Sequence, residues 1–190
     1  MLRFMRLILT CALALVVLYW LFASSEPPES IAAHVHGPHD GMVASFQDGT
    51  ETGHLELKLH DDKGDLELWL GRDAAFSTPF DLPIDATVEV EFTDKDGRKV
   101  TLRARNQAQN EDESGKPNAR DGKTNYFVFP TQPNEDAAWL TAEKFSSLVV
   151  VRFTRDGREF VSQKMEFVIV LVPLFWWYTP PVLLRDELLL

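Results

Sequence analysis

The chain has 190 residues, 45% of them hydrophobic and 11% aromatic, and a formal net charge of −10. This length and composition fit one globular domain once an N-terminal segment is set aside. The acidic balance argues against nucleic acid as a partner, because nothing in the sequence offers a basic stripe for phosphates, and against docking on an anionic membrane surface.

Residues 1–25 have the parts of an export signal. Arg3 and Arg6 precede an apolar run over residues 7–23, and two serines follow it, as in a secretory signal peptide. The run is at the short end of what spans a bilayer, and aromatic residues at its far end favour the headgroup layer and impede cleavage. We expect an uncleaved N-terminal membrane helix; a removed signal peptide is the alternative. Either way, the rest of the chain is exported to a periplasmic or other extracytoplasmic space.

Histidines, not cysteines, are the candidate metal ligands. The only cysteine, Cys11, lies within the apolar run, so the exported part has no disulfide, no thiolate metal site and no cysteine nucleophile. Residues 26–41 form a Pro/His-rich linker with three clustered histidines beside an aspartate. Imidazole is neutral near pH 7 and suits zinc or copper; the alternative is a solvated leader that binds no metal. The candidate ligands are His34, His36, His39 and Asp40.

Residues 54–71 predict a β-hairpin. Leucines alternate with polar residues in both halves, and Asp61-Asp62-Lys63-Gly64 is typical of a tight turn. Strict alternation indicates one buried face and one wet face. His54 and His60 fall on the polar face of the first half, too far apart to share an ion without help from another strand, so we expect both at the surface.

The same alternation continues to residue 172. We expect strands over 42–46, 87–93, 100–104, 125–129 and 148–154, a long last strand over 159–172 with a bulge near Gln163, and a helix over 134–145. Residues 42–172 are therefore predicted to form a mainly β domain, an antiparallel β-sandwich of about eight strands with one short helix.

Two segments depart from this pattern. Residues 106–124 hold no large apolar side chain, which predicts a mobile acidic loop; its acids Glu111-Asp112-Glu113 are expected to be solvated rather than to meet a cation. Residues 167–184 carry no charge but contain three prolines, which argue against a second membrane helix. We expect a buried last strand followed by an apolar tail, residues 173–190, that rests on a membrane or partner.

No catalytic motif is present. The sequence lacks Gly-x-Ser-x-Gly, a Walker-type loop, a dinucleotide fingerprint and His-Glu-x-x-His. Aspartates and glutamates sit in turns and on alternating outward positions, which solvation explains. We therefore expect no enzymatic activity.

One short motif resembles a known family. Gly37-Pro38-His39-Asp40-Gly41, a short strand and then His54-Leu55-Glu56-Leu57 with its hairpin resemble the small N-terminal β domain of periplasmic adaptor subunits of heavy-metal efflux pumps, and related small exported proteins of unknown role. The likeness covers about residues 37–167. The family motif reads Gly-Pro-His-Gly-Gly, so Asp40 departs from it, and the helical hairpin and lipoyl-like parts of an adaptor are missing. The resemblance implies an exported, metal-associated β module, with His39 the one matching histidine, and no transport activity.

Two functions follow as hypotheses. The first is a membrane-anchored exported β domain that acts as a non-catalytic accessory binding or scaffold module, with a membrane or envelope protein complex as its partner. The second is a divalent-metal-binding accessory protein, associated with heavy-metal efflux, that uses the His34/His36/His39 cluster.

Overall fold

The structure, a computed structural model, describes residues 35–60, 64–141 and 144–170. The predicted membrane segment (1–25), most of the linker (26–41) and the apolar tail (173–190) lie outside these ranges, so the predictions made for them stay predictions. No helix within the described ranges is long and apolar enough to cross a bilayer.

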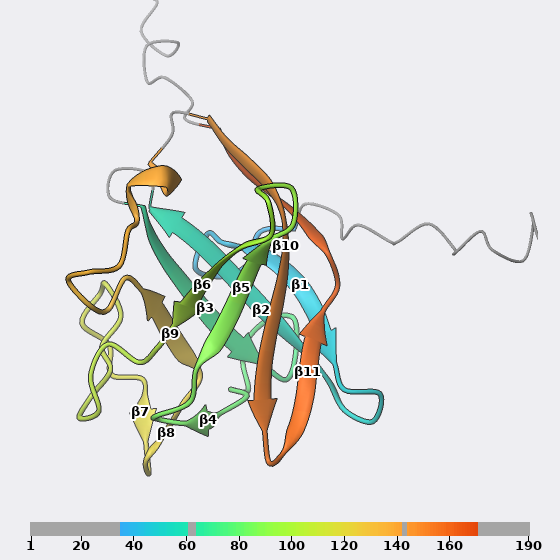
Figure 1. Ribbon diagram of the computed structural model, residues 1–190. Coiled ribbons are helices and arrows are strands. Elements are labelled where there is room, and N and C mark those ends of the chain that lie inside the picture. The colour runs from blue at the N-terminus through green and yellow to red at the C-terminus, as the bar shows by residue number, and fades with distance from the viewer. Residues whose placement is uncertain (1–34, 61–63, 142–143, 171–190) are drawn as a thin grey trace, which may run out of the picture.

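The described residues confirm a mainly β, antiparallel domain (Figure 1). Its strands are β1 (Met42–Gln47), β2 (Thr52–His60), β3 (Asp65–Gly71), β4 (Leu82–Pro83), β5 (Val88–Phe92), β6 (Arg98–Leu102), β7 (Ala119–Arg120), β8 (Lys123–Thr124), β9 (Tyr126–Phe129), β10 (Lys144–Arg155), β11 (Arg158–Ser162) and β12 (Met165–Val170). A 3-10 helix, η1 (Ala138–Leu140), lies between β9 and β10.

One curled sheet holds most of these strands, where the sequence predicted a two-sheet sandwich. Its order is β6-β5-β10-β11-β1-β2-β3-β9, with β12 also paired to β10, and a small sheet β4-β8-β7 lies beside it. The sheet nearly closes into a barrel, because Arg103, just after β6, exchanges two backbone hydrogen bonds of 3.0 and 2.8 Å with Val128 of β9. Alternation along a strand cannot distinguish these architectures, since both bury one face around one core.

The predicted bulge near Gln163 is confirmed, and it separates β11 from β12. Arg152 lies opposite Val161 and Val149 opposite Met165, so two residues of β10 face three of the partner segment. The Ser162 hydroxyl accepts a hydrogen bond from the Val151 amide at this point, which satisfies a backbone donor that the bulge displaces. The long β10 therefore pairs with β11 over one half and with β12 over the other.

The helix predicted over 134–145 is wrong. Among the described residues of this range only η1 is helical, and Lys144 and Phe145 already belong to β10, where they lie opposite Val170 and Ile169. The end of the segment pairs with a neighbouring strand, and the few residues that remain are too few to sustain an α-helix.

A single hydrophobic core fills the barrel, as the alternation predicts. The leucines of β2 and β3 are buried and lie opposite one another, Leu57 facing Leu68. Phe46 packs edge-on against Phe80, with ring centroids 5.0 Å apart. The Arg155 guanidinium lies over the Phe80 ring, 4.4 Å from its centroid, and so covers one end of the core with a charged group.

We expect Leu57→Ala to lower the free energy of unfolding by about 2–5 kcal/mol, because it leaves a cavity at a fully buried position. Denaturant titration followed by circular dichroism measures this. Val35→Ala is the control: Val35 is 54% exposed, and its truncation should change stability by less than about 0.5 kcal/mol. An unchanged midpoint for Leu57→Ala would contradict the assigned core.

Candidate functional site

The face of β2, β3 and β9 that points away from the core is covered by other segments, so the prediction that this face is exposed to solvent is wrong. We call it the outer face. The leader residues 35–41 and the segment 103–118 lie over it, held by hydrogen bonds and ion pairs to its side chains and to the Tyr126 backbone carbonyl. The buried side chains of the outer face include Glu56, Glu67, Trp69, Tyr126 and Val128.

Glu56 organises the leader. Its Oε1 atom accepts hydrogen bonds of 2.8 Å from the backbone amides of both His39 and Gly41, and its Oε2 atom lies 2.7 Å from Nδ1 of His39. A buried carboxylate needs such donors, because burial without them is costly. A Cβ atom on Gly37 would lie 2.3 Å from Cδ of Glu56, so the backbone can approach this closely only at glycine.

The Gly-Pro-His-Asp-Gly motif is thus a loop built around a carboxylate. Asp40 has a φ of 63°, in the left-handed region where glycine is most comfortable and aspartate is one of the better-tolerated alternatives. The adaptor-like motif has glycine at this position, so Asp40 departs from it with little conformational conflict. The motif's residue types have a structural explanation that requires no bound ligand.

His39 is held on two sides. Besides its contact with Glu56, its ring stacks on Trp69, with centroids 4.2 Å apart and an interplanar angle of 4°. The Phe76 ring meets it edge-on, at 6.2 Å. Packing and the carboxylate therefore fix the imidazole and occupy Nδ1.

The other predicted ligands do not join His39. His34 lies outside the described residues, while His36 and Asp40 are exposed. Within the described ranges, the one group of three or more histidines and acids whose ligand atoms lie within 4.8 Å of one another does not include His36, His39 or Asp40. Metal binding by the predicted cluster stays a prediction.

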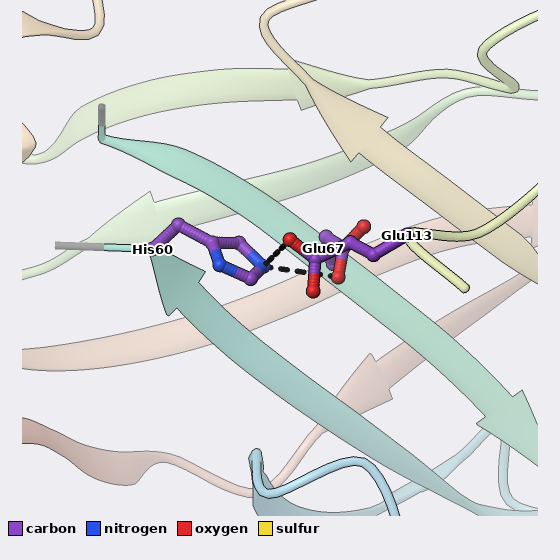
Figure 2. A group of neighbouring side chains, drawn as sticks. All are labelled: His60, Glu67 and Glu113. Carbon is purple, nitrogen blue, oxygen red and sulfur yellow. Dashed lines mark hydrogen bonds and ion pairs between the residues drawn. The ribbon is translucent and has the colours of Figure 1, made fainter. Parts of the chain in front are cut away.

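That group is His60, Glu67 and Glu113 (Figure 2). His60 ends β2, Glu67 lies on the neighbouring β3, and Glu113 comes from the segment 103–118. Nε2 of His60 lies 3.1 Å from Oε2 of Glu67 and 3.2 Å from Oε1 of Glu113. A single ring nitrogen therefore faces one oxygen of each carboxylate.

The other oxygen of each carboxylate has its own partner. Oε1 of Glu67 accepts a hydrogen bond from the Tyr126 hydroxyl and lies 3.6 Å from Arg105. Oε2 of Glu113 accepts a hydrogen bond of 3.4 Å from Lys58. The two inner oxygens are thereby left directed at His60.

The charges of the group reinforce one another. The hydrogen bond to Glu67 raises the pKa of His60 above its ordinary value, against the effect of burial, and the charge of Glu113 acts in the same direction. Burial favours the neutral form of Glu67, but hydrogen bonds from His60 and Tyr126 outweigh it and lower the pKa of the Glu67 carboxyl. Burial and the hydrogen bond to Glu67 raise the pKa of Tyr126, so the phenol stays protonated and donates.

A divalent cation can replace the proton that Nε2 of His60 shares with the carboxylates. Zinc bonds of about 2.0–2.2 Å to nitrogen and oxygen place neighbouring ligand atoms about 3–4 Å apart, close to the separations found here. Glu67 and His60 are fixed by the hairpin, whereas the Glu113 side chain is 52% exposed and can adjust.

Part of this group is readable from the sequence. With a turn at residues 61–64, His60 and Glu67 become diagonal neighbours across the hairpin, since His60 lies opposite Asp65. His54 and His60, both expected at the surface, are each partly exposed, and the His60 side chain is 18% exposed. Glu113 is far away in the sequence, and no pattern links it to the hairpin.

We expect Gly37→Ala to lower the free energy of unfolding by about 1–3 kcal/mol, because its methyl group would overlap the Glu56 carboxylate. A double-mutant cycle with Glu56→Ala tests the cause: in that background the same change should cost little. Equal costs in both backgrounds would show that the two residues are not coupled.

The His60–Glu67 pair predicts a dependence of stability on pH. Because its pKa is raised, His60 contributes its full stabilisation of the folded chain below about pH 6.5, and this contribution is lost as pH rises through the folded-state pKa. Because its pKa is lowered, Glu67 contributes its full stabilisation above about pH 4.3, and this contribution is lost as pH falls through the folded-state pKa of Glu67. Relative to His60→Gln, the parent chain should be more stabilised at about pH 5.5 than at about pH 9.

Denaturant titrations at both pH values measure this difference. His54→Gln on the same strand is the control, and its stability relative to the parent should change little between the two. A His60→Gln penalty that grows with pH would contradict the proposed ion pair.

Comparisons of the chain with protein-family models, with curated proteins and with solved structures found no match. They give no link to efflux adaptor domains, and that resemblance stays a prediction based on the leader motif and the strand pattern.

Proposed function

We propose that the chain is an exported, membrane-anchored β module that acts without catalysis as an accessory binding protein, and that it binds a divalent transition-metal ion at His60, Glu67 and Glu113. The observation that carries this proposal is the convergence of one imidazole nitrogen and two carboxylate oxygens within 4.8 Å. The membrane anchor and export rest on the N-terminal sequence alone.

The ligand set favours zinc or copper over calcium or magnesium. Imidazole suits the transition metals, whereas calcium takes six to eight oxygen ligands and magnesium keeps several waters in an octahedral shell. Three protein ligands leave a fourth position for water or for a group from a partner. Lys58 and Arg105 lie against the outer oxygens of the carboxylates, and their positive charge should keep the affinity modest.

Metal binding at this group is coupled to protons. The ion binds the neutral imidazole, so it must displace the proton from Nε2 of His60. The neighbouring carboxylates raise the pKa of His60 and so make this proton harder to remove than usual. Affinity should therefore increase with pH until His60 is deprotonated, and binding below that point should release about one proton.

The leader supports a second arrangement of the same function. His36 and Asp40 line a cavity of about 330 Å³ that His60 also lines. Of the ligands predicted from the sequence, His36 and Asp40 therefore share a cavity with His60. This placement favours the metal-associated hypothesis over a scaffold that binds no ion.

Calorimetric titration of the full-length chain in detergent with Zn²⁺ and Cu²⁺ tests the proposal. We expect His60→Gln and Glu67→Gln to weaken binding at least about tenfold, and the control His54→Gln to leave it unchanged. Ca²⁺ and Mg²⁺ should give no comparable heat.

The triple change of His34, His36 and His39 to Ala separates the two sites. If the triple variant binds metal as tightly as the parent chain, the site is the group at His60. If the triple variant loses binding while His60→Gln keeps full affinity, the site is in the leader. If the parent chain binds neither ion, the metal-binding proposal is wrong and the scaffold hypothesis remains.

A further inference from the structure

The two ends of the barrel differ in character. One end carries η1, the β5–β6 turn, the start of β10 and the end of β12 (Figure 1); we call it the η1 end. The opposite end carries the β10–β11 turn, where Arg158 pairs with Asp48 at 2.6 Å and with Glu51 at 3.2 Å. β10 runs between the two ends, and its 12 residues span about 36 Å at roughly 3.3 Å per residue.

The chain enters and leaves the barrel near the η1 end. His36, next to the first described residue, and Val168, two residues before the last, line the same cavity with His60. Val170 lies opposite Lys144 at the very start of β10. The sequence after Val170 holds no charged residue until Arg185, so an apolar stretch begins at this end without any polar spacer.

Aromatic and basic side chains gather at the η1 end. The Arg98 guanidinium lies over the half-buried ring of Trp139, 4.2 Å from its centroid, and Nζ of Lys95 lies 5.9 Å from the centroid of Phe145. These residues line one hollow of about 720 Å³. Tryptophan beside long basic side chains is the composition found at the interface between lipid headgroups and acyl chains.

Local charge permits contact with uncharged headgroups. Asp94 and Asp96 line the same hollow as Lys95 and Arg98, so opposite charges balance there although the whole chain carries −10.

Both ends present ion pairs, Arg98 with Asp136 at the η1 end and Arg158 with Asp48 at the other. At the opposite end the rings beneath the arginines, Phe80 and Phe160, are fully buried and offer lipid no apolar contact, whereas Trp139 is only half-buried. Within the described ranges, the η1 end holds the hollow lined by a half-buried tryptophan, and the last described strand ends there ahead of the apolar sequence.

We propose that the barrel stands on the bilayer by its η1 end, with Trp139, Arg98 and Lys95 in the headgroup layer and the β10–β11 turn farthest from the membrane. The occupant of this surface is the lipid bilayer itself. The orientation rests on the membrane anchoring proposed above and does not depend on metal binding.

Two matched turn positions test the orientation. Asp96 and Asp156 each precede the glycine of a hairpin turn with φ values of 54° and 52°, and they lie at opposite ends of the barrel. In the full-length chain carrying Cys11→Ser, Asp96→Cys or Asp156→Cys is labelled with bimane and reconstituted into phosphatidylcholine vesicles that contain a lipid with a nitroxide on its choline headgroup. Bimane emission is compared with that in vesicles without the nitroxide lipid.

We expect the nitroxide lipid to quench position 96 at least about threefold more than position 156, because about 36 Å of strand separates the two ends and contact quenching is short-ranged. Equal quenching, or stronger quenching at position 156, overturns the orientation. Flotation of the same vesicles tests the anchor separately: a chain that does not float with lipid overturns both the anchoring and the orientation.

Discussion

Burial of carboxylates on the outer face of the β2–β3 hairpin is the constraint that the covering segments satisfy. A carboxylate removed from water must find donors, and the backbone amides of the sheet supply none because they are already paired. The leader donates two backbone amides and an imidazole to Glu56, while the Tyr126 hydroxyl and His60 serve Glu67. The leader's side-chain contacts with the hairpin therefore centre on Glu56, whereas Arg105 and Glu113 of the segment 103–118 lie against Glu67 and His60.

This arrangement turns a simple antiparallel sheet into a layered structure. Inside the barrel, leucines and phenylalanines form one core; outside, Trp69, Tyr126 and Val128 form a second small apolar cluster with Phe76 packed against it. The apolar cluster excludes water from the acids beside it, and low local polarity strengthens their ion pairs and hydrogen bonds. The His60 group lies at the margin of this layer, where Glu113 still reaches solvent.

The sequence predicted what depends on neighbours along the chain and missed what depends on distant segments. Alternation and turn residues indicated the β2–β3 hairpin, the strands β5 and β6 and the bulge at Gln163, because these are local patterns. It could not indicate that residues 103–118 would cover Glu67, since Asn110 reaches the Tyr126 carbonyl only in the folded chain. Asn110 is buried within this segment, and the short strands β7 and β8 follow it; polar contacts hold this part of the chain, and hydrophobic patterns do not reveal them. The mobility predicted for residues 106–124 stays a prediction.

The leader's attachment to Glu56 has a mechanical consequence. Residues 35–41 meet the domain through the backbone hydrogen bond from Val43 to Val35, the His36–Met42 bridge and the three contacts on Glu56. A pull on the chain ahead of Val35 is therefore borne first by these few bonds and only afterwards by the strands of the barrel. The leader's contacts therefore protect the geometry of the β2–β3 hairpin for as long as they hold.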